Sequence, residues 1–240
     1  MASLPLFFYD GPLQQGAEIW PDEDTSRHVM QVLRMQRGGQ LQFTDGKGHK
    51  ATAVITEAQK KKFAAIVSEV AYTEPPATPL YLCVAFTKNT SRNEWLLEKV
   101  TEMGVTAIVP LLTARTERER IRYDRWQNIL VSALLQSQQC HLPILHEAMP
   151  LAAAMDMYKE TPQKLVAHCI DIKTRTPVNI ALQPHKETII FIGPEGDFTT
   201  EEVDLCEAQG YTGITINNNR LRTETAAMAA CAYFNLLNHA

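Results

Sequence analysis

A stretch with three prolines in five positions, Thr73-Glu-Pro-Pro-Ala-Thr-Pro79, divides the sequence into two parts with different hydrophobic patterns. Each proline fixes its own φ and removes a backbone donor, so the stretch favours neither a sheet nor a helix and predicts an extended connector. A chain of 240 residues is long enough for two domains, each with its own core. We therefore predict a domain over residues 1–72, a linker over 73–79 and a second domain over 80–240.

The first part is rich in β-strand signals. Short runs of apolar and β-branched residues are separated by Gly, Asp and Lys clusters such as Asp45-Gly-Lys-Gly48. The runs cover residues 40–44, 51–56 and 63–67. Their spacing predicts a small barrel.

In the second part, continuous apolar runs alternate with amphipathic stretches. The runs cover residues 80–86, 107–112, 165–170, 188–192 and 213–216. Strands that are apolar on both faces are typical of a parallel sheet covered by helices on each side. Two pairs, Ser91 with Glu94 and Thr199 with Glu202, have the spacing of capping boxes at helix starts. This part is therefore predicted to be an α/β domain.

The composition excludes several classes of protein. A hydrophobic fraction of 45% with 21% charged residues is that of a globular chain rather than a disordered one. The first ten residues lack the basic segment of a signal peptide, and no apolar run is long enough for a membrane span, so we expect a cytoplasmic protein with no membrane partner. The five cysteines include no CxxC pair, so we expect no metal site. A net charge of −4 leaves any nucleic-acid contact to local basic surfaces.

The segment Gly193-Pro-Glu-Gly-Asp197 forms a turn directly after an apolar run and directly before a capped helix. Ligands of open α/β sheets bind at the carboxyl ends of the strands, where glycine lets the backbone approach a ligand closely. The segment is neither a dinucleotide fingerprint nor a P-loop, since GxGxxG and a final Lys-Ser/Thr are both missing. Taken alone, it is either a structural turn or a ligand-binding loop.

A second polar segment, Asn217-Asn-Asn-Arg-Leu-Arg-Thr-Glu-Thr225, precedes an apolar helix. Asparagine bonds its own backbone in turns and tolerates left-handed conformations. A carboxylate such as Glu224 is favoured in the first turn of a helix by the helix dipole. A well-capped helix with solvated arginines accounts for Thr223 and Glu224, but accounts less well for the density of polar groups around them.

Together these two segments are similar to the paired motifs of the RsmE family, within the SPOUT class of RNA methyltransferases. The motifs are Gly193-Pro-Glu-Gly196 and Leu221-Arg-Thr-Glu-Thr-Ala226. Further segments that resemble the family are Lys88, Arg92, Glu98-Lys-Val-Thr-Glu-Met-Gly-Val105, His28, Val32-Leu-Arg-Met35 and Asp45–Gly48. The similarity covers essentially the full chain in the same order.

The resemblance implies an α/β SPOUT domain with a C-terminal trefoil knot, preceded by a small PUA-like β-barrel domain. It implies that a homodimer methylates N3 of a uridine in 16S rRNA, within the 30S subunit or its precursor, using S-adenosyl-L-methionine. The residues expected at the cofactor are His168, Ile192, Gly193, Pro194, Glu195, Gly196, Ile216, Asn217, Leu221, Arg222 and Thr223. As side chains, His168 and Cys169 are expected to pack rather than react.

The sequence departs from the family pattern in three places. Asp197 stands where the family commonly has a second glycine, and Ile216-Asn-Asn218 stands where it commonly has Leu-Gly-Pro. Because asparagine is tolerated at positive φ, we expect Asn217 to substitute for that glycine. Gln138-Gln139 follows Gln136-Ser137 at a position that is often basic in the family, which weakens one expected contact to RNA phosphate.

Methylation at N3 of uridine requires the loss of an imide proton. If the pKa of that proton lies about two to three units above 7, deprotonation costs roughly 3–4 kcal/mol at neutral pH. An arginine that donates to the uracil oxygens would offset this cost, as preorganised donors do for other oxyanions. We predict this catalytic role for Arg222. Glu224 either accepts the proton or, preferably, holds Arg222 in place through an ion pair.

The N3 edge of uridine is used in Watson–Crick pairing, so the target base must be unpaired or splayed out. Local basic residues in both parts of the chain are the candidates for RNA contact. They are Arg27, Arg34, Arg37, Lys88, Arg92, Arg115 and Arg118. Arg34 and Arg37 are preferred because they flank a family motif.

Two alternatives remain open. One is a ribose 2′-O-methyltransferase of the same knotted class, and the other is a non-catalytic RNA-binding or ribosome-assembly protein. Nucleoside analysis of the modified RNA separates the first from N3 methylation, and binding of S-adenosylmethionine separates the second.

Overall fold

The computed structural model describes residues 4–59, 62–117 and 121–238, which form two compact units. The first unit contains the chain up to Pro75 together with Leu134–Leu142, and the second contains Pro76–Ala133 and Pro143 onward. The proline-rich segment 73–79 contains no helix and no strand. Each unit has its own hydrophobic core.

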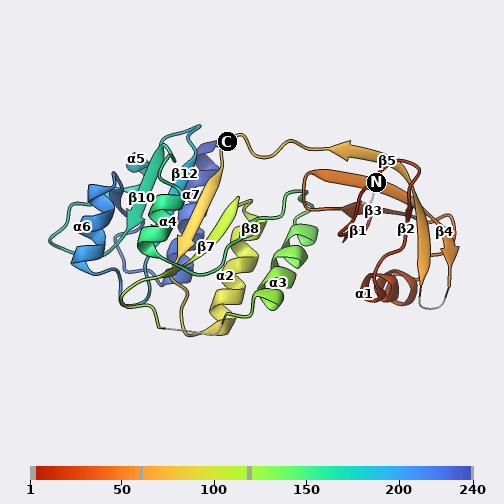
Figure 1. Ribbon diagram of the computed structural model, residues 1–240, viewed down its shortest axis with the longest axis horizontal. Helices are drawn as coiled ribbons and strands as arrows, with labels where there is room; N and C mark the ends of the chain where they lie inside the picture. Colours follow the sequence, from red (N-terminus) through yellow and green to blue (C-terminus); the bar gives the residue numbers. More distant parts are fainter. Residues whose placement is uncertain (1–3, 60–61, 118–120, 239–240) are drawn as a thin grey trace. The chain divides into compact units, whose positions relative to one another are not determined.

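A five-stranded sheet forms the first unit, in the order β1-β3-β4-β5-β2 (Figure 1). The strands are β1 (Leu6–Phe8), β2 (Glu18–Ile19), β3 (Gln40–Thr44), β4 (His49–Ala58) and β5 (Phe63–Tyr72). The three central strands pair antiparallel, and β1 runs parallel to β3. The predicted strands are confirmed, although β4 and β5 are longer than the apolar runs. Alternate side chains of these strands, such as Leu41 and Phe43, point into the core.

Beside this sheet lie a short helix, α1 (Glu23–Arg27), and a π-helical turn, η1 (His28–Val32). The helix begins at Asp22, whose side chain accepts a hydrogen bond from the Thr25 amide at 2.7 Å. Val29 of the turn is fully buried in the core of the unit. The chain then turns at Arg34, which has a φ of 53°.

Residues 134–142 complete the first unit, although they follow it in sequence by some sixty positions. The amide of Gly48 donates to the carbonyl of Cys140, and the amide of Leu142 donates to the carbonyl of Gly46, both at 2.9 Å. Gly48 has a φ of 101°, and a Cβ there would lie 2.6 Å from the Thr73 carbonyl oxygen. The turn at residues 45–48 is thus shaped to receive this segment.

The second unit is built on a parallel sheet in the order β11-β13-β10-β12-β6-β7-β8, with β9 also paired to β7. Its strands are β6 (Leu80–Val84), β7 (Ala107–Leu112), β8 (Ile144–Leu145), β9 (Met149–Pro150), β10 (Gln163–Ala167), β11 (Thr176–Pro177), β12 (Thr188–Ile192) and β13 (Thr212–Thr215). The five predicted apolar runs correspond to β6, β7, β10, β12 and β13, and the predicted α/β class is confirmed. β10 begins two residues earlier and ends three residues earlier than the predicted run, since the chain leaves the sheet after Ala167.

The helices of this unit are α2 (Thr90–Glu102), α3 (Tyr123–Gln136), α4 (Leu151–Met157), α5 (Val178–Ala181), α6 (Thr200–Ala208) and α7 (Thr223–Asn238). At α6 the predicted capping box is confirmed: the Thr199 amide donates to Glu202 at 2.8 Å and the Glu202 amide donates to Thr199 at 3.2 Å. At α2 the predicted cap is wrong. Asn89 caps the helix by accepting from the Arg92 amide at 3.1 Å, which leaves Ser91 in the first turn.

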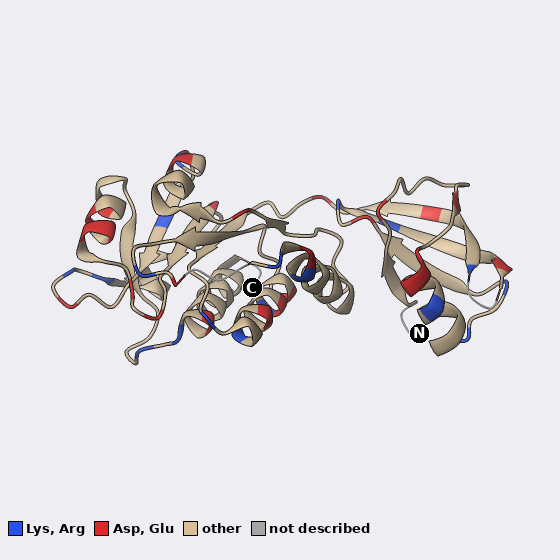
Figure 2. Cartoon of the chain, turned by 60° about the horizontal axis from the view of Figure 1, so that its bottom comes forward, with Lys and Arg blue, Asp and Glu red and all other residues tan. Residues whose placement is uncertain are grey.

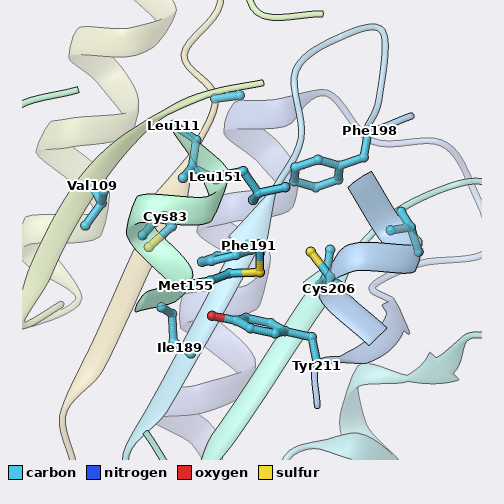
Figure 3. Close-up of a cluster of buried hydrophobic side chains, with 14 residues drawn as sticks. Cys83, Val109, Leu111, Leu151, Met155, Ile189, Phe191, Phe198, Cys206 and Tyr211 are labelled. Atoms are coloured by element: carbon cyan, nitrogen blue, oxygen red, sulfur yellow. The ribbon is translucent and has the colours of Figure 1, made fainter. Parts of the chain in front are cut away.

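Two helix layers cover the sheet. α4 and α6 pack on one face, over Cys83, Ile189 and Phe191 (Figure 3). α7 contacts β6 and β12, and α2 packs against α7. No helix within the described ranges is long and apolar enough to cross a bilayer.

Tyr211 is buried in the core under α4 and α6. Its ring stacks on Phe191 with centroids 4.6 Å apart, and it is 4% exposed (Figure 3). The hydroxyl has no hydrogen-bond partner among the described residues, and burial raises the pKa of this phenol. Burying a hydroxyl without a hydrogen-bond partner costs free energy. The ring of Tyr211 therefore packs well in the core, but its hydroxyl destabilises the folded state.

We predict that Tyr211→Phe raises the free energy of unfolding by about 1 kcal/mol, because it keeps the ring stack and removes the unpaired hydroxyl. For a protein of this size the midpoint of thermal unfolding should rise by roughly 2–4 °C, measured by calorimetry. Tyr81→Phe is the matched control, since burial and the nearby Glu187 raise the pKa of the Tyr81 hydroxyl, which unlike that of Tyr211 is not among the buried polar atoms without a partner, so its removal should bring no gain. A lower midpoint for Tyr211→Phe would mean that the hydroxyl is hydrogen-bonded in solution.

Candidate functional site

Three neighbouring parallel strands end at the same edge of the second sheet. β10 lies between β12 and β13, with Ala167 in register with Ile192 on one side and with Ile214 on the other. The loops that follow these strands therefore start side by side. They enclose a cavity of about 370 Å³ at the carboxyl ends of the strands, where open α/β sheets bind ligands.

Every residue expected at the cofactor lines this cavity except Gly196. Several of its lining residues lie outside the predicted loops, among them Ala167, Ile214 and Thr215. The full lining consists of Ala167, His168, Cys169, Ile192, Gly193, Pro194, Glu195, Asp197, Ile214, Thr215, Ile216, Asn217, Asn219, Arg220, Leu221, Arg222, Thr223 and Ala226. The two polar segments identified in the sequence, at 193–197 and 217–225, thus both contribute residues to the wall of one cavity.

The loop 193–198 is held by residues from two other segments. The buried Thr223 hydroxyl donates to the Gly193 carbonyl at 3.0 Å, which ties the start of α7 to the loop. On the outside, Arg115 donates to the Gly196 carbonyl at 2.6 Å. A Cβ on Gly196 would lie 3.2 Å from the Arg115 side chain, so this glycine makes room for the arginine rather than for a ligand.

Asp197 adopts the left-handed conformation that we expected at Asn217. Its φ is 64°, whereas Asn217 is not among the residues with positive φ in the described chain. Asn217 instead accepts from the Asn219 amide at 3.3 Å, in a local turn. The sequence signal at Asp197 was present but misassigned, since Asp and Asn both tolerate this conformation.

His168 is 4% exposed and lies at the start of the loop after β10. Its Nδ1 accepts a hydrogen bond from the Ile170 amide at 3.3 Å, and burial lowers the pKa of the imidazole. The ring is therefore neutral near pH 7, with its proton on Nε2. Nε2 is buried without a partner in the part of the chain that is described. A Cβ on Gly213 would lie 2.8 Å from Nε2, so only glycine leaves space for this ring.

The two predicted catalytic residues, Arg222 and Glu224, lie in different environments. Arg222 is exposed and lines the cavity. Glu224 is 7% exposed, does not line the cavity, and pairs with Arg92 of α2 at 3.6 Å. The expected ion pair between Glu224 and Arg222 is wrong, because α7 begins at Thr223 and its first turn faces α2 while Arg222 precedes the helix.

Figure 2 shows Lys and Arg scattered among Asp and Glu in both units. Arg34 and Arg37 are exposed on the first unit. Three other cations pair with acidic side chains: Arg27 with Asp24 at 2.6 Å, Lys88 with Glu117, and Arg92 with Glu224. Arg115 binds the loop carbonyls, and Arg118 lies outside the described residues. No group of three or more potential metal ligands occurs within residues 4–59, 62–117 and 121–238.

Residues 73–235 match the family model of the RNA methyltransferase domain, and residues 21–68 match that of the RNA methyltransferase PUA domain. The first match contains both polar segments and all three strand ends of the cavity. The second match lies within the five-stranded first unit.

Known relatives agree with both matches. A ribosomal RNA small subunit methyltransferase E from Synechocystis sp. is 28% identical over 216 residues, which are 88% of this chain and 70% of the relative. The crystal structure of a probable rRNA-methyltransferase from Porphyromonas gingivalis has a TM-score of 0.90 at 32% identity, covering 98% of both chains. A ribosomal RNA small subunit methyltransferase E from Neisseria gonorrhoeae, bound to S-adenosyl methionine, has a TM-score of 0.84 at 27% identity, again over 98% of both chains. Matched along almost its whole length, the chain belongs to the RNA methyltransferase family that includes ribosomal RNA small subunit methyltransferase E.

Proposed function

We propose that this chain transfers the methyl group of S-adenosylmethionine to N3 of a uridine in 16S rRNA. The observation that carries the proposal is the cavity at the ends of β10, β12 and β13, whose walls hold both family motifs. A family member with this fold binds S-adenosyl methionine. The substrate follows from the small-subunit rRNA methyltransferases that the chain matches over most of its length.

The residues around the cavity fit this cofactor. Ile192, Ile216 and Leu221 supply apolar surface for the adenosine, and Gly193 lets the backbone approach closely. His168 also lines the cavity, with a neutral imidazole ring that is 4% exposed. When bound, S-adenosylmethionine supplies an electrophilic methyl group without a metal, so the protein has to align donor and acceptor.

Arg222 is proposed to stabilise the negative charge that develops on the uracil oxygens as the N3 proton leaves. It lines the cavity, is exposed, and forms no salt bridge within the described residues, so its donors are available. Preorganised donors of this kind contribute several kcal/mol when they face the developing charge. Glu224 pairs with Arg92 instead, which makes it a positioning residue for α2 and Arg92 in this proposal.

We further propose the finer architecture implied by the family. The second domain, over residues 80–240, would contain a trefoil knot formed by the segments around the cavity, and the hydrogen bond from Thr223 to Gly193 supports a close passage of these segments. The first domain, over residues 1–72, would be a PUA-like β-barrel, joined by the linker 73–79. It would contact RNA through Arg27, Arg34 and Arg37, with Lys88, Arg92, Arg115 and Arg118 contributing from the second domain.

A homodimer is part of the same proposal. α2 and α7 lie side by side, joined by a hydrogen bond of 2.6 Å from the Asn235 side chain to the Met103 carbonyl. Four large apolar side chains of this helix pair are exposed: Trp95 by 40%, Tyr233 by 37%, Leu236 by 70% and Leu237 by 37%. Exposed apolar surface on a helix pair favours burial against a second copy.

We predict that the purified protein, incubated with S-adenosylmethionine and 30S subunits that lack their own modification, produces 3-methyluridine in 16S rRNA. The measurement is mass spectrometry of the nucleoside digest, followed by mapping of the modified position. A 2′-O-methyl nucleoside in place of 3-methyluridine would identify the ribose methyltransferase alternative. A protein that fails to bind S-adenosylmethionine in calorimetry would be a non-catalytic rRNA-binding protein.

We predict that Arg222→Ala lowers the rate of methylation by about a hundredfold or more, because it removes a donor to the developing oxyanion. The dissociation constant for S-adenosylmethionine, measured by calorimetry, should change much less. Arg220→Ala is the matched control, since Arg220 lines the same cavity two positions earlier. Near-normal turnover of Arg222→Ala, or an equal loss in both variants, would contradict the assignment.

We predict that Leu236→Glu converts a dimer into monomers, because a charge on the exposed apolar face of α7 opposes burial. Light scattering coupled to size-exclusion chromatography gives the molar mass directly. Leu205→Glu introduces the same charge at an exposed leucine of α6, which is 42% exposed, and should leave the mass unchanged. A monomeric unmodified chain would refute the dimer.

A further inference from the structure

One carboxylate on the wall of the cavity has no part in the proposed methyl transfer. Asp197 ends the turn after β12 and lines the cavity together with Cys169. Its amide donates to the Pro194 carbonyl at 2.9 Å, which closes the turn. Its φ of 64° lies in the left-handed region, which Asp tolerates better than most residues with a Cβ but which is still less favourable for it than for glycine.

That conformation directs the carboxylate toward another loop. Oδ2 accepts a hydrogen bond of 2.6 Å from the amide of Cys169, which lies 28 positions earlier in the chain. Oδ1 accepts from the amide of Phe198 at 2.9 Å. Hydrogen bonds from backbone amides to an ionised carboxylate are stronger than bonds between neutral groups. One side chain thus satisfies backbone donors in two different loops, those after β10 and β12.

The amide of Cys169 depends on this side chain because the β-ladder has already ended. β10 stops at Ala167, and its pairing with β12 stops at the same residue, so residues 168–170 are no longer held by strand partners. The next amide, that of Ile170, is bound by the Nδ1 atom of His168. Side chains therefore replace the ladder in fixing the backbone of this loop.

The loop 193–198 is held on its other side as well. Arg115 donates to the carbonyls of Gly196 and Phe198, at 2.6 and 3.4 Å, and the Ala114 amide donates to Glu202 at 2.8 Å. These contacts fix the outer surface of the loop but do not reach residues 168–170. Among the described residues, the bond from Cys169 to Asp197 is the hydrogen bond that joins the two loops directly.

We propose that Asp197 is a positioning residue for cofactor binding: its carboxylate holds residues 168–170 against the loop 193–198 and so fixes the separation of two cavity walls. The inference rests on the proposed function, because it takes S-adenosylmethionine as the ligand. Asp197 itself takes no part in the methyl transfer. It acts through the backbone of Cys169.

Three substitutions separate the carboxylate from the backbone conformation. Asp197→Gly removes the carboxylate and relieves the positive φ, Asp197→Ala removes the carboxylate and keeps the strain, and Asp197→Asn keeps one acceptor oxygen and tolerates the conformation. If the carboxylate holds the loops, Asp197→Gly and Asp197→Ala should both raise the KM for S-adenosylmethionine by about tenfold or more, and Asp197→Asn by a smaller factor. The KM for 30S subunits should stay unchanged, which a general loss of structure would not allow.

Asp156→Asn is the matched control, since Asp156 is a surface carboxylate of α4 whose side chain is 81% exposed. It should retain both KM values. An Asp197→Gly variant with the KM of the unmodified chain would overturn the proposal, because it would show that only the backbone conformation matters.

Hydrogen exchange of the ligand-free protein tests the same contact without methylation. The Cys169 amide should exchange at least tenfold faster in Asp197→Gly than in the unmodified chain, with the amides of α6 unchanged as an internal reference. Equal exchange at Cys169 would refute the contact. If the Cys169 amide loses protection in Asp197→Gly as expected but the unmodified chain does not methylate 30S subunits, the proposed function is refuted and the loop contact stands.

Discussion

The cavity depends on the parallel pairing of β10 with β12 and β13. Parallel strands that are neighbours in a sheet end at the same edge, so this pairing brings the end of β10 beside segments that lie 25 and 47 positions later in the sequence. Packing of the strands under α4 and α6 and against α7 fixes the register, because a slip would separate packed pairs such as Phe191 and Tyr211. The loops then need only short-range contacts to form a cavity.

Those contacts are made mostly by side chains bonding to backbone. Thr223 binds the Gly193 carbonyl, Arg115 binds the Gly196 carbonyl, and Asp197 binds the Cys169 amide. Irregular loops have no ladder, so their buried backbone groups must find such partners. The result is a cavity whose shape is determined by a few polar side chains from distant segments.

The sequence predicted the strands of the large sheet and the two motif loops, because apolar runs and glycine positions report directly on burial and turns. It did not predict which of several similar residues caps a helix, adopts a positive φ or forms an ion pair, because tertiary contacts determine these features. Asn89 rather than Ser91 caps α2, and Asp197 rather than Asn217 has the positive φ, because residues of similar propensity compete and local geometry selects one. The partner of Glu224 was misassigned for the same reason: ion pairing depends on which helix faces the carboxylate, and α2 supplies Arg92.

The first unit is discontinuous in sequence, and this limits how the protein can be divided or recombined. The turn at residues 45–48 takes its backbone partners from Cys140 and Leu142, and His141 binds the Thr73 carbonyl at 2.7 Å. A fragment that ends in the proline-rich segment would leave these groups to water. An intact first unit therefore needs the segment Leu134–Leu142 as well as the N-terminal residues. Any transfer of this unit to another protein has to include both stretches of the gene, and changes in one stretch constrain changes in the other.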